Sequence, residues 1–342
     1  MTADLIVHRT GPGVTVQDQG RAGYLSFGLS RGGAADPVAL AEGAALLGQS
    51  PDCAALEMAG MGGRFEASND IRIALTGAPM RAAIEGEALR WNASHTLPKG
   101  AKLDIGPVTS GSYGYLHLGG GIDTAPALGA RAAHLTAGLG KAIEAGDTLP
   151  LGADKGSDTG LCLPADDRFD GGAVRVLPSL QTQLFPQQQR DRFADTQFTR
   201  DARANRMGVQ VTCDGPGFEV EGGLSVVSEI IVPGDIQITG DGTPFVLMAE
   251  CQTTGGYPRI GTVIPADLPR VAQAPAGAKL RFRFITLDEG VALHRTHLQR
   301  LADLPKALTP LIRDPARMRD LLSYQLISGA TAGRELDRKD TE

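Results

Sequence analysis

Residues 11–21 read Gly-Pro-Gly-Val-Thr-Val-Gln-Asp-Gln-Gly-Arg, a short β-branched run set between glycines. Val14, Thr15 and Val16 favour a strand, and the following glycine favours a turn that ends it. The polar side chains of Gln17, Asp18 and Arg21 lie in this stretch, where glycine allows a ligand to approach the backbone. The stretch predicts either a small-molecule site or a turn with internally satisfied side chains.

A second stretch of the same kind, Gln-Thr-Thr-Gly-Gly-Tyr-Pro, occupies residues 252–258. Its Gln, Thr and Tyr side chains are neutral hydrogen-bonding groups, which suit an amide, ureido or lactam ligand that offers both N–H and C=O. We predict that residues 17–21 and 252–257 line one polar pocket. The predicted substrate-binding residues are Gln17, Asn205, Arg206, Gln252, Thr253, Thr254 and Tyr257.

The remainder of the chain predicts a mainly β protein. Alternating or apolar runs typical of strands recur at residues 71–75, 103–105, 113–118, 174–177, 209–211, 236–238 and 245–248. Asp36-Pro37 starts a helix that Gly48 ends, and a second short helix is predicted at residues 186–196. We expect a first β domain over residues 1–160, a Gly- and Asp-rich linker at 152–172, a second β domain over 170–288 and a helical tail over 289–342, with one helix near residue 291 and another over 314–329.

Composition narrows the classes of function. The chain has 342 residues, 45 of them glycine, and a formal net charge of −6. Such an acidic balance argues against a nucleic-acid surface. No stretch is long and apolar enough to cross a membrane, no targeting segment is recognised, and the four cysteines are widely spaced, so we expect a cytoplasmic protein with reduced thiols.

Motifs for nucleotide binding and for nucleophilic catalysis are absent from the sequence. It contains no phosphate-binding GxxxxGK loop, no GxGxxG after a strand, no GxSxG elbow and no Met-Lys-Met-like hairpin for biotin. We therefore expect neither direct ATP binding nor attached biotin, and no metal site. Asp18 and Arg21 are the predicted catalytic residues: Arg21 either holds a ligand carboxylate or only braces Asp18. The general base is left open among Asp18, Glu229 and Asp267.

Five stretches, taken in order, resemble the carboxyltransferase-domain family of urea amidolyase. They are residues 15–21, 33–36, 75–78, 205–208 and 252–258. Stand-alone bacterial members of this family include the C subunit of 5-oxoprolinase and an antagonist of a sporulation-kinase inhibitor. One departure is Ala249-Glu250-Cys251 before Gln252, where the family often has Asp and Arg. The long tail after residue 290 is another, since the core family does not require it.

The resemblance implies two cyclophilin-like β-barrel domains, to which the sequence pattern adds a short C-terminal helical tail. It also implies a subunit-B-like partner and a third, lactam-utilisation subunit, with which the chain would open 5-oxoproline to glutamate using ATP bound by the assembled complex. Two alternatives stay open. One is a carboxyltransferase acting on a urea- or amide-like substrate with a separate biotin protein, and the other is a regulatory protein without catalysis.

Overall fold

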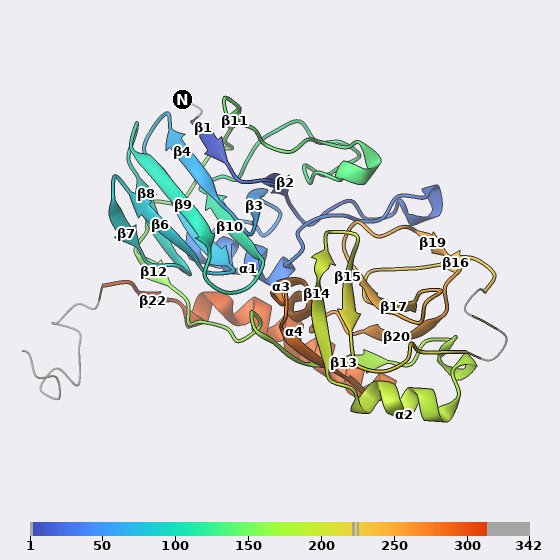
Figure 1. The fold of residues 1–342 in the computed structure, drawn as a ribbon. Coiled ribbons are helices and arrows are strands. Elements are labelled where there is room, and N and C mark those ends of the chain that lie inside the picture. The colour runs from blue at the N-terminus through green and yellow to red at the C-terminus, as the bar shows by residue number, and fades with distance from the viewer. Residues whose placement is uncertain (1–2, 221–222, 224–225, 313–342) are drawn as a thin grey trace, which may run out of the picture.

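The N-terminal part of the computed structural model consists of two antiparallel sheets around one core (Figure 1). The structure describes residues 3–220, 223 and 226–312. The first sheet has the order β11 (Thr148–Pro150), β1 (Asp4–Thr10), β4 (Gly63–Ala67), β9 (Lys102–Val108), β6 (Met80–Ile84) and β7 (Glu87–Leu89). The second has the order β2 (Thr15–Gln17), β3 (Ala55–Ala59), β10 (Tyr113–Leu118), β5 (Ile71–Gly77), β8 (Ala93–Leu97), β12 (Leu161–Cys162) and β22 (Thr309–Pro310).

Alternation in the sequence decides which face of each strand is buried. In β9, Leu103 and Ile105 are buried while the residues between them are partly exposed, as expected for a strand with one face on the core. β5 is buried along its whole length because α1 covers the face that points away from this core. Side chains of both sheets, among them Phe65 and Leu116, form one apolar cluster.

The second part of the chain is a closed seven-stranded barrel. Its strands follow the order β13 (Gly171–Leu177), β20 (Arg259–Val263), β17 (Asp235–Ile238), β18 (Pro244–Leu247), β15 (Gly208–Thr212), β14 (Phe198–Ala204) and β21 (Lys279–Phe284). Four fully buried rings pack against one another in its core, with centroids of neighbouring rings 5.0–5.9 Å apart: Phe193, Phe198, Phe218 and Phe282. The two short strands β16 (Glu229–Ile230) and β19 (Thr254–Gly255) form a separate two-stranded antiparallel sheet. The mainly β fold with a barrel and a short C-terminal helix is confirmed.

Two of the α-helices begin at side-chain caps. α1 spans Pro37–Leu47; the Asp36 carboxylate accepts from the backbone N–H groups of its first turn, and Gly48 closes it at φ 58°. α2 (Gln187–Asp195) confirms the predicted short helix, and α3 (Leu268–Gln273) connects the barrel strands β20 and β21. α4 (Leu287–Asp303) begins with a capping box between Thr286 and Glu289.

The C-terminal segment runs along both halves of the molecule (Figure 1). At its start, α4 brings Gly290 against Leu177 of the barrel, and at its end it contacts α1. The chain then pairs β22 with β12 in the second sheet, so the segment predicted as a linker, residues 152–172, contributes a strand to that sheet. The helix predicted over residues 314–329 lies outside the described residues.

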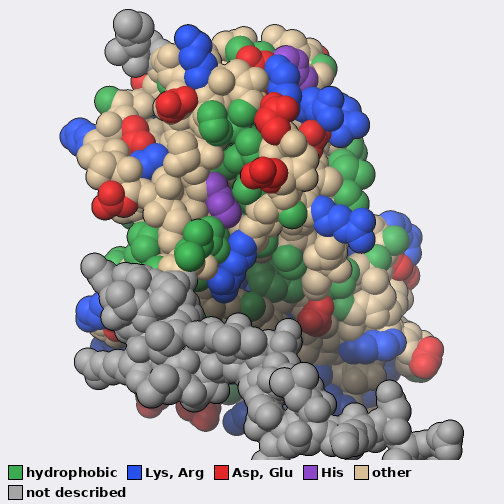
Figure 2. All heavy atoms as spheres, turned by 90° about the vertical axis from the view of Figure 1, so that its left-hand side faces the viewer, with side chains coloured by type: hydrophobic (Ala, Val, Ile, Leu, Met, Phe, Trp, Pro, Cys, Tyr) green, Lys and Arg blue, Asp and Glu red, His purple; other side chains and the backbone are tan. Residues whose placement is uncertain are grey.

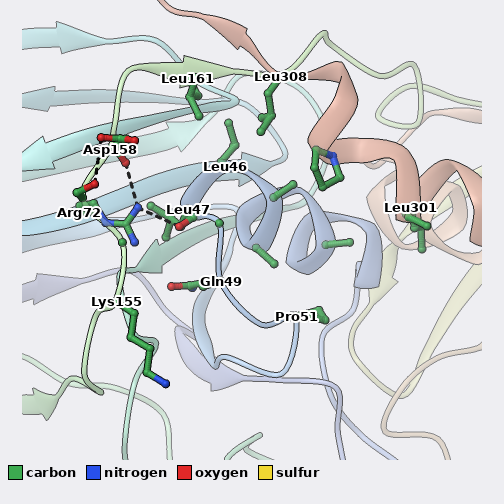
Figure 3. A pocket seen from close by; sticks show the side chains of 18 of the residues that line it. Leu46, Leu47, Gln49, Pro51, Arg72, Lys155, Asp158, Leu161, Leu301 and Leu308 are labelled. Atoms are coloured by element: carbon green, nitrogen blue, oxygen red, sulfur yellow. Dashed lines mark hydrogen bonds between the residues drawn. The ribbon is translucent and has the colours of Figure 1, made fainter.

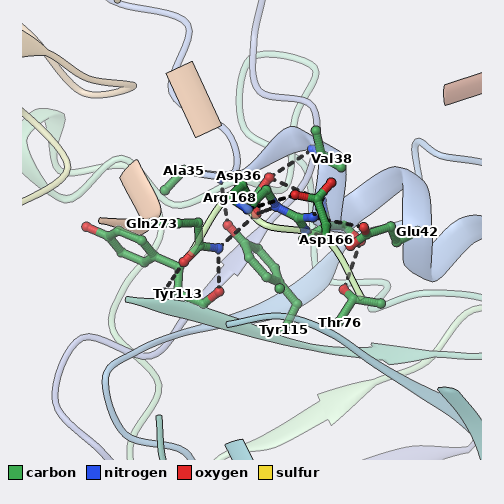
Figure 4. A network of polar contacts seen from close by, with 12 residues as sticks. Ala35, Asp36, Val38, Glu42, Thr76, Tyr113, Tyr115, Asp166, Arg168 and Gln273 are labelled. Atoms are coloured by element: carbon green, nitrogen blue, oxygen red, sulfur yellow. Dashed lines mark hydrogen bonds and ion pairs between the residues drawn. The ribbon is translucent and has the colours of Figure 1, made fainter. Parts of the chain in front are cut away.

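A buried polar network connects the two halves (Figure 4). Arg168 donates from Nε to Asp36, at 2.8 Å, and from both terminal nitrogens to Glu42, at 3.0 and 2.7 Å. The side-chain amide of Gln273, at the end of α3, makes three further bonds. Its Nε2 donates to the Asp36 carboxylate and to the Tyr113 backbone carbonyl, and its Oε1 accepts from the Tyr113 backbone N–H. A cap of α1 is therefore also the point at which the barrel is fastened to the first domain.

His117 is enclosed between β10 and α1. Its Nε2 lies 2.7 Å from the Thr76 hydroxyl, and its ring packs so closely on Gly43 that a Cβ there would meet it at 2.3 Å. Complete burial lowers the pKa of His117 to about 3. The folded protein therefore keeps a neutral imidazole at a pH at which the unfolded chain already binds a proton.

We expect acid to destabilise the protein through this histidine. Because the folded pKa lies below the unfolded value, His117 should cost about 2 kcal/mol of unfolding free energy between about pH 7 and about pH 5. Urea unfolding at both pH values should show a smaller loss for His117→Gln than for the wild type. An equal loss in the two proteins would mean that other groups carry the acid sensitivity.

Candidate functional site

A polar pocket of about 490 Å³ lies where the first domain meets the barrel domain. Residues 28–30 and 134–137 form one side, and residues 250–254 form the other. Figure 1 shows the blue segment before α1 reaching toward β19, and the backbone N–H of Gly32 donates to the carbonyl of Ala249 across this junction. The pocket is lined by Gly28, Leu29, Ser30, His134, Thr136, Ala137, Met207, Glu250, Cys251, Gln252, Thr253 and Thr254.

Three titratable or hydroxyl side chains meet in this pocket. The Ser30 hydroxyl lies 2.8 Å from His134 Nε2, and His134 Nδ1 lies 3.8 Å from a carboxylate oxygen of Glu250. All three residues are buried, with exposed fractions of 3%, 4% and 4%. Ser30 and His134 come from the first domain and Glu250 from the barrel, so the cluster exists only when the two domains are packed together.

The surroundings hold His134 in its neutral form. Burial is the largest influence and lowers the pKa of His134; Glu250 opposes this shift, while Arg21 and Arg206 add to it. The Ala137 backbone N–H donates to Nδ1 at 3.3 Å, which favours the tautomer with its proton on Nε2. In this tautomer His134 donates from Nε2 to the Ser30 hydroxyl, while its Nδ1 accepts from the Ala137 N–H.

Glycine is required at three positions beside His134 and Arg21. Gly32 has φ +63°, and a Cβ at this position would lie 3.3 Å from the His134 ring and 3.6 Å from the Arg21 guanidinium. Gly20 and Gly33 cross each other at positive φ, and a Cβ on Gly33 would come within 2.8 Å of the Gly20 nitrogen. The glycines of the first motif therefore allow two backbone segments to pass each other behind His134.

The second predicted motif lines the pocket. Gln252, Thr253 and Thr254 form its barrel side, and Gln252 also lines a neighbouring cavity of about 530 Å³. Asn205 and Tyr257 line that neighbouring cavity. The two cavities share Met207, Cys251 and Gln252, so the structure gathers these predicted residues around two adjoining spaces.

The first predicted motif lies behind the pocket wall. Gln17, Asp18 and Arg21 are buried, with exposed fractions of 0%, 7% and 3%, and none of them lines either cavity. Asp18 accepts from the backbone N–H groups of Gly20 and Arg131, which brace the loop. The prediction that both motifs line one pocket is therefore corrected: the loop around residues 17–21 needs its polar side chains to satisfy backbone groups inside the first domain.

Arg21 does not brace Asp18 by a direct bond. Its guanidinium donates to the carbonyls of Ala127 and Ala132, and its third nitrogen has no hydrogen-bond partner among the residues described. Burial lowers the pKa of Arg21, while Asp18 and Glu250 raise it. Arg21 thus places a buried positive charge next to His134 without reaching the pocket itself.

Arg206 joins the two domains directly behind Glu250. Its guanidinium pairs with Glu250 and with Glu57 of β3, and it also donates to the Gly33 carbonyl. Glu57 in turn accepts from the Tyr115 hydroxyl at 2.6 Å. All three nitrogens of the Arg206 guanidinium form hydrogen bonds inside the protein, so Arg206 holds Glu250 in place. A contact of Arg206 with substrate stays a prediction.

A larger cavity, of about 810 Å³, lies beside α1 (Figure 3). Alanines of α1 and leucines near the end of α4 give it a mainly apolar lining. Its buried cation, Arg72, is already bound to Asp154 and to the carbonyls of Leu47 and Asp158. The larger volume therefore lacks the convergent polar groups that the smaller pocket has.

The residues described were also searched for a metal site, a membrane-spanning helix and a basic surface for nucleic acid. No group of three or more His, Cys, Asp or Glu side chains there could hold a metal ion. None of the helices that the structure describes is long and apolar enough to span a bilayer. Figure 2 shows acidic and basic side chains interspersed over the described part of the face on the first-domain side, which does not form a continuous basic surface for nucleic acid.

Comparison with known proteins identifies the family. The sequence model described as "Carboxyltransferase domain, subdomain A and B" matches residues 27–284, about three quarters of the chain. The chain belongs to this carboxyltransferase-domain family. It is 32% identical to the C subunit of 5-oxoprolinase from Escherichia coli over 291 residues, which cover 84% of this chain and 93% of that protein.

Two solved structures share the fold of this chain. The crystal structure of TTHA0988 is 30% identical with a TM-score of 0.76, and the match covers 82% of this chain but 56% of that one. The urea carboxylase of Kluyveromyces lactis has a TM-score of 0.79 at 21% identity, with 92% of this chain and 31% of that one covered. This chain therefore corresponds to part of each of these two longer chains.

The carboxyltransferase-domain motifs predicted the barrel side of the pocket, residues 252–254, but not His134 and Glu250, its titratable side chains. Of the bases considered from sequence, Glu229 pairs with Arg259 and Asp267 pairs with Arg175, both away from the pocket. Ser30 and Glu250 adjoin two of the recognised stretches, whereas His134 lies in none. Glu250 lies in the stretch that departs from the family pattern, and it is a buried carboxylate paired with Arg206.

Proposed function

We propose that this chain is the C subunit of an ATP-dependent 5-oxoprolinase, acting with a subunit-B-like partner and a third, lactam-utilisation subunit. The observation that carries the proposal is the near full-length similarity to the C subunit of the Escherichia coli 5-oxoprolinase. The polar pocket agrees with it, because Gln252, Thr253 and Thr254 offer neutral donors and acceptors to a lactam amide.

The assembled complex, rather than this chain, would supply ATP. The sequence contains no phosphate-binding loop, and the residues that line the pocket include no lysine for a triphosphate. The test is to purify the chain alone, with a subunit-B-like partner, and with both partners, and to measure glutamate released from 5-oxoproline with and without ATP. We expect release only from the full assembly with ATP. Turnover by the chain alone would contradict the proposed role in a complex.

A carboxyltransferase acting on a urea- or amide-like substrate is the second candidate. It is favoured by the family match and by the similarity in fold to urea carboxylase. No biotin-attachment motif occurs in this chain, so a separate carrier would have to deliver carboxybiotin to the pocket. Transfer of carboxyl from free carboxybiotin to urea by the purified chain, without glutamate release by the assembly, would favour this candidate over the first.

Gln252→Ala should lower kcat/KM of the assembled complex about 3- to 10-fold, which is the effect of losing one or two neutral hydrogen bonds to the substrate. Gln252 is exposed at the pocket, so its replacement should leave the melting temperature unchanged. Gln299→Ala on the exposed face of α4 is the matched control and should have wild-type kinetics. Equal kinetics in both variants would remove Gln252 from the substrate site.

A further inference from the structure

We propose that Ser30 and Glu250 recognise the amide group of the substrate, with the Ser30 hydroxyl donating to its carbonyl oxygen and the Glu250 carboxylate accepting from its N–H. His134 fixes the direction of the Ser30 hydroxyl. The proposal rests on the proposed function for the identity of the substrate, an amide-like molecule, and it names the side chains that select it. Ser30, His134 and Glu250 lie outside the set of site residues predicted from sequence.

The hydrogen bonds around His134 run in one direction. The Ala137 backbone N–H donates to Nδ1 at 3.3 Å, so the proton of the neutral ring is on Nε2. Nε2 lies 2.8 Å from Ser30 Oγ, so the ring donates and the serine oxygen accepts. The hydroxyl proton of Ser30 must therefore point away from the ring.

This hydroxyl proton has no acceptor within the part of the chain that the structure describes. His134 Nε2 is the hydrogen-bond partner of Ser30 Oγ there, and it is a donor. Ser30 is buried, yet it lines the polar pocket. Since buried hydrogen-bonding groups are normally paired, the pocket wall presents a donor to the molecule that fills it.

A second histidine–hydroxyl pair in this chain lacks such a free donor. The Thr76 hydroxyl lies 2.7 Å from His117 Nε2, and it donates to the Ala39 backbone carbonyl at 2.9 Å. Its proton is thus used inside the protein, and neither Thr76 nor His117 lines the cavities described above. The Ser30 hydroxyl differs on both points, since it lines a cavity and has no carbonyl of the described residues to receive its proton.

Glu250 supplies the complementary acceptor. One oxygen of its carboxylate pairs with Arg206, and the other lies 3.8 Å from His134 Nδ1. Nδ1 carries no proton in this tautomer, so it gives that oxygen no hydrogen bond, and no other donor of the described residues reaches it. Glu250 is buried and lines the pocket, where a carboxylate oxygen without a donor is costly. It therefore presents an acceptor to an N–H of the ligand.

A donor and an acceptor in one pocket match the two polar groups of an amide. Its carbonyl oxygen accepts from a hydroxyl, and its N–H donates to a carboxylate. A lactone has a ring oxygen in place of the N–H, so it would leave the Glu250 carboxylate without a donor, and the pocket should reject it. Residues 252–254 adjoin Glu250 on the barrel side, and the carbonyl oxygen has a second lone pair for them.

The main test compares 5-oxoproline with the lactone of the same ring, in which oxygen replaces N–H. Dissociation constants are measured by calorimetry on the assembled complex with a non-hydrolysable ATP analogue. The wild-type complex should bind the lactone at least about 10-fold more weakly than 5-oxoproline. Ser30→Ala should weaken both compounds by the same factor, about 3- to 10-fold, because both keep the carbonyl oxygen. A Ser30→Ala complex with wild-type affinity for both compounds would overturn the proposal.

Glu250→Gln should instead change the selectivity. It should weaken 5-oxoproline about 10- to 100-fold, the effect of losing a hydrogen bond to a charged group. The new amide N–H can donate to the lactone ring oxygen, so the preference for the lactam should fall at least about 10-fold. An unchanged preference would overturn the role of Glu250. The controls are Ser26→Ala in the exposed turn Leu25–Phe27 and Glu144→Gln, also exposed, which should keep both wild-type affinities.

His134→Leu tests whether the ring orients Ser30. Leucine cannot donate to Ser30 Oγ, so the hydroxyl is free to turn away from the ligand. Ser30→Ala should therefore cost less affinity for 5-oxoproline in the His134→Leu background than in the wild type. The same cost in both backgrounds would contradict the orienting role, and melting temperatures show whether each variant is folded.

Glutamate release distinguishes failure of this proposal from failure of the proposed function. If the wild-type assembly releases none, the function is wrong, and the donor–acceptor pair is judged by the dissociation constant of urea, which also carries N–H and C=O. Weaker urea binding by Ser30→Ala and Glu250→Gln, but not by Ser26→Ala, would support the pair. Wild-type affinity of both variants for 5-oxoproline in an assembly that does release glutamate would overturn the pair and leave the function standing. Absence of binding of both 5-oxoproline and urea to the wild-type assembly would contradict both.

Discussion

Arg168→Ala should lower the free energy of unfolding by about 3–5 kcal/mol, the cost of leaving buried charges without their partner. Asp36 and Glu42 are buried, and Arg168 is the cation that binds both of them. Burial already raises the pKa of Glu42, and Arg168 opposes this shift. Without the guanidinium, two carboxylates would face each other at the start of α1, where the barrel is fastened through Gln273.

Urea unfolding of the full-length chain at neutral pH measures this effect. Arg64→Ala is the control, because Arg64 makes a two-bonded ion pair with Asp104 at the exposed surface. Exposed pairs contribute about 0–1 kcal/mol. A loss for Arg168→Ala that is no larger than the loss for Arg64→Ala would show that the network in Figure 4 does not hold the domains together.

Arg206→Ala should have a similarly large effect, about 3–5 kcal/mol of unfolding free energy, and it should also remove the activity of the complex. The substitution leaves Glu57 and Glu250 buried without their cation. It also breaks the bond to the Gly33 carbonyl, so the first domain loses a tie to the barrel beside the pocket. Glu250 would then no longer be held opposite His134.

The matched control for Arg206 comes from the same turn region. Arg203 is exposed and pairs only with Asp201, two residues away, among the residues described, so Arg203→Ala should change stability by less than about 1 kcal/mol. Urea unfolding and glutamate release are measured on both variants. A stable Arg206→Ala protein that loses only activity would mean that Arg206 contacts substrate, as the sequence predicted, and is not a brace.

The fold was predictable because local signals agreed with it. Asp36-Pro37 and Gly48 marked the ends of α1, and alternation marked β9 and β13. The strand within the predicted linker, residues 152–172, could not be predicted. The two residues of β12 are too few to show an alternating pattern, and the strand forms by pairing with β8 and β22. The buried ion pairs of Arg168 join residues more than 120 positions apart, which no local pattern reports.

The candidate site was half predictable. Residues 252–254 could be placed at a ligand site, because neutral hydrogen-bonding side chains next to glycines suit a small polar ligand. Gln17 and Arg21 have the same local signature, yet they satisfy backbone carbonyls of residues 127–133 that only the tertiary fold brings near. His134 carries no local signal, because its partners Ser30 and Glu250 are 104 and 116 positions away.

The most direct measurement is a crystal structure of the assembled complex with 5-oxoproline bound and a non-hydrolysable ATP analogue present. The account predicts the lactam in the polar pocket, with its amide against residues 252–254. Ligand density in the apolar cavity beside α1, or a polar pocket that stays empty while 5-oxoproline binds only to the partner proteins, would contradict it.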